Sequence, residues 1–287
     1  MHVQDRDAVG VAMRGPERLK DGISAVFRAP LWELLRERRH PIYSVTAPEG
    51  VFVAAGPPDR WVYGIPWDPD NERLEDWTPE RVIARIRAGA AAPGLDVRLE
   101  HLRPFSYAAQ LADRFRDRNV FLAGDAAHRV SPRGGTGMNT AIRDGFDLGW
   151  RLAWVLRGWA RPELLDGYES ERRPVAAHNV ARSADPNGSV RDPLGELQVD
   201  LGGRLPHAWL EDGRSTLDLV GDGLTLLGGP HAQTPHTAAG NAPVTRHEIS
   251  ALAARALGIG EGGWLLARPD GVPVTASREP AGYLAAA

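Results

Sequence analysis

The chain has 287 residues, of which 43% are hydrophobic and 25% charged, with a formal net charge of −3. This length suits one large domain or two smaller ones, and a charge near zero gives no reason to expect nucleic-acid or membrane binding. The chain has no cysteine, which excludes disulfides and thiol chemistry and fits a reducing cytoplasm. No apolar run reaches the length of a membrane span. No spacing of His, Asp or Glu predicts a metal site, so we expect none.

The first part of the chain predicts a sheet. After a polar start, residues 9–15 read as a strand, and alternation then predicts strands at 25–27, 41–46, 51–55 and 61–65, separated by turn formers. This is typical of a β-meander. Its aromatic side chains either line a cavity for a planar ligand or pack the core of the sheet. The cavity candidates are Tyr43, Phe52, Trp61, Tyr63 and Trp67.

A helix and two more strands come next. Thr78-Pro79-Glu80 supplies an N-cap, a proline at the first helical position and an acid in the first turn, which predicts a helix to about residue 91. Residues 96–102 and 105–112 then read as two strands.

The most informative stretch is residues 119–158. A short apolar run at 119–123 ends at Gly124-Asp125, and a glycine-rich loop at 132–137 follows. Apolar residues then recur at helical spacing and predict a long, buried helix to about residue 156. They are Met138, Ala141, Ile142, Gly145, Leu148, Gly149, Leu152, Val155 and Leu156. The loop gathers backbone N–H groups at a helix N-terminus, where an anion or a carbonyl dipole can bind.

The last part of the chain alternates between helices and strands. A second helix is predicted at 162–180, where Glu171, Arg172 and Arg173 either tie the helix to the sheet or form a solvated face. Residues 183–206 are rich in Asp, Asn, Gly and Pro and predict a linker. Strands at 215–220, 224–227, 244–245 and 264–267, a helix at 248–257 and a final strand after the turn at 268–271 then follow.

The stretch 119–158 resembles a known family. GDAAH, SPRGGTGMN and DGFDLGWRLA are similar to the second flavin-binding motif of FAD-dependent class A aromatic monooxygenases, the p-hydroxybenzoate hydroxylase-like family. The resemblance implies that Asp125, after Gly124, bonds the sugar-alcohol or ribose region of FAD, and that Pro132 lies near the isoalloxazine. It also implies that the loop and the start of the helix meet the flavin pyrimidine edge through Gly134, Gly135, Gly137, Met138 and Asn139. No catalytic residue is assigned, because in this family the protein positions the ring and stabilises reduced flavin while NAD(P)H supplies the electrons.

The resemblance extends over nearly the whole chain, but only over the back part of the family's sequence. No strand–GxGxxG–helix unit is present, and the GxGxxG at 258–263 follows a helix and leads into a strand, so it reads as a cap and a turn. We therefore predict an α+β or α/β protein in four parts: a substrate-binding sheet region (1–118), a flavin-domain remnant with long helices (119–182), the linker (183–206) and a thioredoxin-like domain without thiols (207–287). The resemblance to the actinomycete polyketide-tailoring branch implies an aromatic or polyketide substrate.

Three functions stay open. The chain is a fragment or one half of a split monooxygenase that needs a separate FAD-binding N-terminal half. Alternatively, it is a flavin-independent tailoring enzyme, such as a cyclase or isomerase, built on a truncated scaffold. The third alternative is a binding or scaffold protein without catalysis. A homodimer formed through the C-terminal domain is a further expectation, and FAD binding is expected to be weak without the ADP site.

Overall fold

The computed structural model of the protein describes residues 8–56, 58–187, 203–233 and 241–277, together with Arg6 and Val199. Most of the predicted linker therefore lies outside the described residues. The chain forms two compact units, one of residues 15–109 and one that joins the first 14 residues to the chain from Gln110 onward. The first unit is narrower than the predicted region 1–118, because residues 13–14 and 110–112 pair with each other inside the second unit.

The unit of residues 15–109 is an antiparallel sheet of five strands in the order β3-β4-β5-β2-β6. The strands are β2 (Lys20–Arg28), β3 (Ile42–Thr46), β4 (Glu49–Gly56), β5 (Arg60–Pro66) and β6 (Arg98–Tyr107). Strands β3, β4 and β5 form the predicted meander, whereas β2 lies between β5 and β6. The two strands predicted at 96–102 and 105–112 are one continuous strand to Tyr107, and a short helix, α2 (Leu31–Leu35), was not predicted.

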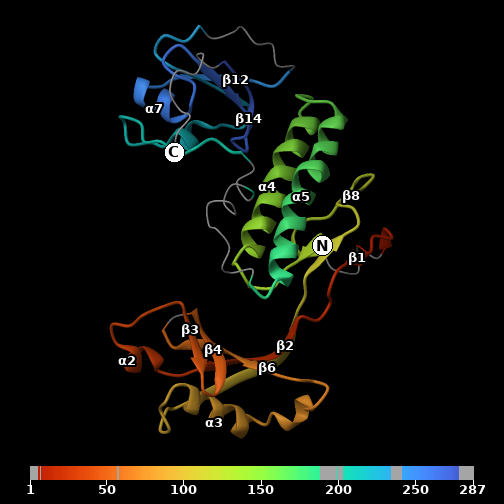
Figure 1. The fold of residues 1–287 in the computed structure, drawn as a ribbon, viewed down its shortest axis with the longest axis vertical. Coiled ribbons are helices and arrows are strands. Elements are labelled where there is room, and N and C mark those ends of the chain that lie inside the picture. Colours follow the sequence, from red (N-terminus) through yellow and green to blue (C-terminus); the bar gives the residue numbers. More distant parts are fainter. Residues whose placement is uncertain are drawn as a thin grey trace. The chain divides into compact units, whose positions relative to one another are not determined.

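Helix α3 (Pro79–Gly89) covers one face of this sheet (Figure 1). It begins as predicted, because the Thr78 side chain accepts a hydrogen bond from the Arg81 N–H and Pro79 occupies the first position. Val82 and Ile86 on its inner side are fully buried among sheet residues. Burial of apolar area between α3 and this face of the sheet therefore stabilises the unit.

The strands of the second unit are short. A three-stranded sheet joins β1 (Met13–Arg14), β7 (Gln110–Ala112) and β10 (His128–Arg129), and a hairpin joins β8 (Arg116–Asp117) to β9 (Val120–Phe121). The strand predicted at 119–123 is thus reduced to β9, although Ala123 keeps extended backbone angles.

Two long helices lie side by side in this unit, α4 (Gly137–Leu156) and α5 (Asp166–Ala184), separated by a 3-10 turn at Pro162–Leu165 (Figure 1). Several hydrogen bonds tie helix α5 to the strands and to the segments next to them. The Tyr168 hydroxyl donates to the Leu122 carbonyl at 2.6 Å, and Arg173 Nε donates to the Ala112 carbonyl at 3.2 Å. The prediction that charged residues of this helix tie it to the sheet is therefore confirmed for Arg173.

The C-terminal part contains a four-stranded sheet in the order β12-β11-β13-β14. Its strands are β11 (Leu224–Gly228), β12 (Val244–Glu248), β13 (Trp264–Ala267) and β14 (Pro273–Ser277), and helix α7 (Ala251–Ala256) follows β12. Strands β11 and β12 are parallel, whereas the other pairs are antiparallel. The strand predicted at 215–220 is wrong: Ser215 caps a 3-10 turn at Thr216–Leu219, and Asp218 bonds back to the Ser215 N–H.

Within the described ranges, no helix is long and apolar enough to cross a membrane.

Candidate functional site

The Gly-Asp motif forms a tight turn directly after the extended segment, as predicted. Gly124 has a φ of +58°, and Gly124–Ala126 form a 3-10 turn after the extended Ala123. Asp125 is exposed, and among the described residues its carboxylate has no hydrogen bond or ion pair. A carboxylate placed in this way can accept hydrogen bonds from ligand hydroxyls.

The glycine-rich loop ends at the N-terminus of α4, again as predicted. Gly134 and Gly135 adopt φ values of +82° and +67°, which L side chains rarely adopt. A Cβ on Gly137 would lie 2.6 Å from Val130 Cγ2, so this position also needs glycine. Of the predicted flavin-edge residues, Pro132, Gly135, Met138 and Asn139 are exposed, whereas Gly134 and Gly137 are half-buried.

The start of α4 is suited to an external hydrogen-bond acceptor. Thr136 stands at the N-cap position, but its side chain makes no cap hydrogen bond, and its buried Oγ1 has no partner among the residues described. No acidic residue lies in the first turn. The first N–H groups of the helix, together with the positive end of its dipole, are therefore left for a ligand oxygen. FAD fits this arrangement, since it carries both hydroxyl groups and a polar ring edge.

The fully buried Asp144 anchors the Gly-Asp turn to both long helices. Its Oδ2 accepts from the Gly124 N–H at 3.2 Å and lies 2.6 Å from His128 Nε2. Its Oδ1 accepts from Arg172 Nε at 3.0 Å. Three donors from three elements thus converge on one carboxylate and fix the position of the turn.

A second charged cluster lies further along α4. Arg151, which is 1% exposed, donates to Asp147 at 2.9 Å and forms an ion pair with Glu171 at 2.8 Å. Arg268 bridges Glu171 and Asp270, at 2.6 Å in each case. Burial raises the pKa of Asp147 above its usual value, although its bond to Arg151 opposes the shift. Burial also disfavours the charged Glu171, but Arg268 and Arg151 outweigh it and lower the pKa of that carboxyl.

The orientation of α4 differs from the prediction. The buried face carries Asp144, Asp147, Arg151 and two tryptophans, Trp150 and Trp154. Most of the predicted apolar stripe faces outward instead, with Met138 72%, Ile142 61% and Leu156 84% exposed, and Phe146, which the prediction did not include, is 55% exposed beside them. The expectation of a helix buried through this stripe is therefore wrong. Apolar spacing identified a real helix, but ion pairs and tryptophans occupy its inner side.

The five aromatic cavity candidates lie on the α3 side of the sheet or at its edge. Phe52 and Tyr63 stack with ring centroids 4.2 Å apart, and both are buried with Trp61 in the core. Tyr43, Phe52 and Trp61 also line a cavity of about 240 Å³ in the same unit. Trp67 is half-buried and donates to the Glu72 carbonyl. Phe52, Trp61 and Tyr63 thus pack in the core of the sheet, and a ligand role for the five aromatic residues stays a prediction.

Residues on the second face of the sheet were missed. Register places Val26, Val53 and Val62 in one row across β2, β4 and β5, with Ile42 at one end and His101 at the other. Alternation puts this row opposite the aromatic core. The alternating pattern of the strands could have identified these residues, because they occupy the positions between the aromatic ones. The prediction selected the aromatic residues and so considered only one face of the sheet.

Comparisons with known proteins identify the family. A putative polyketide hydroxylase of Streptomyces halstedii is 38% identical over 248 residues, which cover 80% of this chain and 45% of the relative. Aklavinone 12-hydroxylase of Streptomyces peucetius is 35% identical over 269 residues, or 78% of this chain and 55% of the relative. The chain therefore spans about half the length of these curated relatives.

A solved structure has the same fold. The complex of aklavinone-11 hydroxylase with FAD and aklavinone matches with a TM-score of 0.82 and 30% identity, over 96% of this chain and 62% of the other. The FAD binding domain family matches residues 1–183, which is more than half of the chain. The chain therefore belongs to the FAD binding domain family, in agreement with its resemblance to FAD-dependent aromatic monooxygenases.

Proposed function

We propose that the protein supplies the flavin-edge site and the substrate sheet of an FAD-dependent monooxygenase that hydroxylates an aromatic polyketide, with NAD(P)H as the reductant. One observation carries this proposal: the exposed, unpaired Asp125 and the uncapped N-terminus of α4 both belong to the segment that resembles the flavin motif. The relatives named as polyketide and aklavinone hydroxylases support it. FAD, when bound, would supply the oxygen activation that adds one oxygen atom to an electron-rich ring.

The residues of this chain would bind FAD and orient its ring. The Asp125 carboxylate would accept hydrogen bonds from the sugar-alcohol chain, and the N–H groups after Gly137 would stabilise negative charge on the reduced ring. Asp144 would hold the turn in place through the Gly124 N–H. No general acid or base of this chain is assigned to the reaction.

The substrate would lie on the second face of the five-stranded sheet. Val26, Val53 and Val62 give a smooth aliphatic row without bulky side chains, and a planar ring system can pack flat on such a surface. His101 at one end of the row adds a polar group that could orient a phenol or quinone oxygen.

Another polypeptide segment with the dinucleotide-binding βαβ unit would complete the FAD site. The exposed apolar stripe of α4, with Met138, Ile142 and Phe146, supports the proposal because such surfaces are typical of interfaces. We also propose that the C-terminal sheet is thioredoxin-like, which its strand order supports, and that residues 1–118, 119–182, 183–206 and 207–287 divide the chain by role. A homodimer and a cytoplasmic location belong to the same proposal.

Reconstitution tests the function. The chain is mixed with FAD, NADPH, an aromatic polyketide and the front part of the Streptomyces halstedii relative, and oxygen-dependent gain of one oxygen atom is followed by mass spectrometry. We expect Asp125→Ala to weaken FAD binding about tenfold to hundredfold, since a hydrogen bond to a charged group contributes about 1.5–3 kcal/mol. Glu163→Ala, at an exposed acid outside the site, is the control.

Two results would replace the proposal. A product of unchanged mass, formed without FAD, NADPH or oxygen, would make the protein a flavin-independent cyclase or isomerase. Substrate binding with no product under either condition would make it a scaffold.

A further inference from the structure

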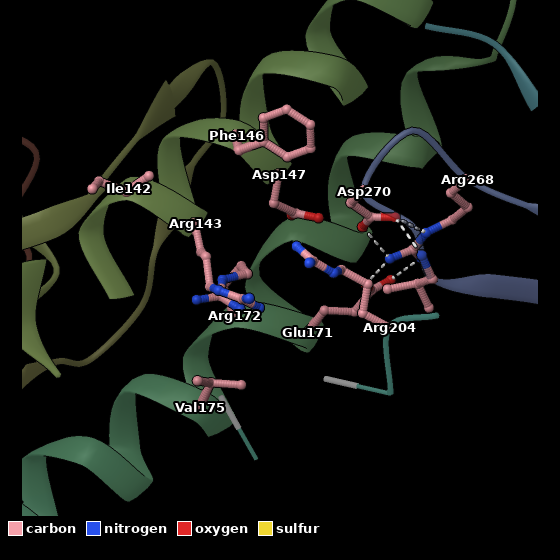
Figure 2. Close-up of a pocket in the computed structure, with 11 residues that line it drawn as sticks. Ile142, Arg143, Phe146, Asp147, Glu171, Arg172, Val175, Arg204, Arg268 and Asp270 are labelled. Carbon is pink, nitrogen blue, oxygen red and sulfur yellow. Dashed lines mark hydrogen bonds and ion pairs between the residues drawn. The ribbon is translucent and has the colours of Figure 1, made fainter. Parts of the chain in front are cut away.

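A pocket of about 450 Å³ lies among α4, α5 and the turn before β14. Figure 2 shows its lining, which includes Arg143 from α4, Arg172 from α5 and Arg204. Ile142, Phe146, Val175 and Val272 supply apolar walls. None of the predicted flavin-edge residues lines this pocket, so it is distinct from the proposed flavin site. Its wall shares Ile142 and Phe146 with the exposed stripe of α4.

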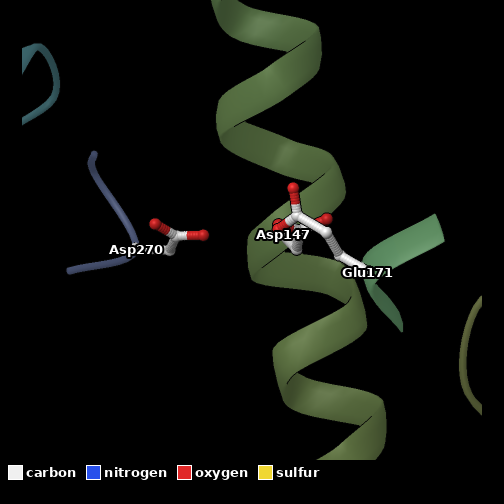
Figure 3. A group of neighbouring side chains, drawn as sticks. All are labelled: Asp147, Glu171 and Asp270. Atoms are coloured by element: carbon white, nitrogen blue, oxygen red, sulfur yellow. The ribbon is translucent and has the colours of Figure 1, made fainter. Parts of the chain in front are cut away.

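Three carboxylates at the edge of the pocket, Asp147, Glu171 and Asp270, lie close enough together to suggest a cation site (Figure 3). Each of them is already paired with a guanidinium group. Arg151 forms ion pairs with Asp147 and Glu171, and Arg268 forms ion pairs with Glu171 and Asp270, with N···O distances of 2.6–2.9 Å. A metal ion would have to displace two arginines, so these acids are better explained as counter-ions.

Two arginines that line the pocket, Arg172 and Arg204, have donor groups without an acceptor among the described residues. Arg172 is 7% exposed, and its Nε is bonded to Asp144. Its Nη2 is buried and has no hydrogen-bond partner in the part of the chain that the structure describes. Arg204 is partly exposed and makes no hydrogen bond or ion pair within the described ranges. A buried guanidinium N–H without an acceptor is costly, and it therefore favours an anionic partner.

The unused donors of Arg172 Nη2 and of the Arg204 guanidinium leave room for one negative group. The apolar walls formed by Ile142, Phe146 and Val175 suit a ligand whose charged end is attached to a hydrophobic body.

We propose that this pocket binds a carboxylate attached to an apolar body, with Arg172 and Arg204 as its hydrogen-bond donors. The planar guanidinium fork matches a carboxylate with two parallel N–H···O bonds. Neighbouring side chains bury Nη2 of Arg172. The ligand carboxylate must therefore displace partly exposed side chains of the pocket lining to reach it. The carboxylate belongs either to a free organic acid or to an acidic side chain of a polypeptide.

Binding of 2-naphthoate to the full chain tests the proposal without any flavin. Its neutral isostere, 2-naphthamide, tests the charge, and inorganic phosphate tests whether any anion suffices. Isothermal titration should give a dissociation constant for naphthoate at least about tenfold lower than for either of the other two probes. A capped Phe-Glu dipeptide identifies the source: tighter binding than naphthoate indicates a polypeptide side chain, and weaker binding indicates a free acid.

Variants locate the site. Arg204→Ala removes a partly exposed side chain without partners, so the fold should be kept, and naphthoate should bind about tenfold more weakly. Phe146→Ala tests the contribution of the apolar wall and should also weaken the binding of naphthoate. Arg161→Ala, an exposed arginine outside the pocket, is the matched control and should change binding less than about twofold. Equal affinity for naphthoate and naphthamide, phosphate binding as tight as naphthoate, or full affinity in Arg204→Ala would overturn the proposal.

Discussion

Removing the carboxylate of Asp144 should destabilise the second unit strongly. Asp144 is fully buried and accepts from Gly124 N and Arg172 Nε while lying 2.6 Å from His128 Nε2. Asp144→Ala leaves the guanidinium of Arg172, itself 7% exposed, without its counter-ion. Breaking a buried pair on one side costs about 3–5 kcal/mol, which is a large fraction of the about 5–15 kcal/mol that keeps a typical domain folded.

The assay is urea denaturation followed by far-ultraviolet circular dichroism, with hydrogen exchange to assign the loss to α4 and α5. Asp113→Ala is the matched control, because Asp113 and Arg14 form an exposed pair in the same unit, with side chains 36% and 76% exposed. We expect that control to change stability only slightly, since exposed pairs are screened by water.

Asp144→Asn should fall between the two variants, because an amide oxygen still accepts one hydrogen bond but carries no charge. Equal stability of Asp144→Ala and Asp113→Ala would refute the view that a buried charge network holds the Gly-Asp turn. A loss of protection confined to residues 15–109 would refute it as well.

Three further predictions follow from single contacts. Burial raises the pKa of Tyr168 above the ordinary 10.0, so the stabilising contribution of its protonated hydroxyl is present below about pH 10 and is lost as the pH rises further. Tyr168→Phe should therefore reduce the pH dependence of the free energy of unfolding above that pH. It should also cost about 1 kcal/mol for the lost bond to the Leu122 carbonyl, as measured by denaturation at several pH values. Gly137→Ala should cost about 1–3 kcal/mol through its clash with Val130, and adding Val130→Ala should restore much of the melting temperature, whereas an unrescued double variant would contradict a steric cause. Trp154→Phe deletes the 2.7 Å bond from α4 to the C-terminal part and should speed hydrogen exchange there at a cost of about 1 kcal/mol; unchanged exchange would argue against that tie.

Local signals predicted much of this fold. Thr78 and Pro79 marked the start of α3, Gly124-Asp125 marked a turn after an extended segment, and the glycine loop marked the start of α4. Each is a short-range effect, in which one side chain or one φ value decides the backbone. The strand predicted at 215–220 failed for the same kind of reason, because a capping box at Ser215 overrode β propensity.

The side chains that face inward could not be predicted as well. On α4, apolar spacing selected Met138 and Ile142, whereas the inner face carries Asp144, Asp147 and Arg151. Their burial depends on partners in α5 and near β14, which are distant in sequence. On the sheet, alternation alone gives two faces and does not say which of them α3 covers.

The exposure of Met138 provides a built-in chemical probe of the accessibility of α4. A thioether that is 72% exposed is open to peroxide, and its oxidation to the sulfoxide is measured by peptide mass. Met13 is only half-buried but lies on a different element, so it serves as an internal reference. Anything that covers the first turns of α4 should slow oxidation at Met138 and leave the rate at Met13 unchanged. The oxidation rate of Met138 can therefore report binding at the start of α4 without a dye, a tag or enzyme turnover.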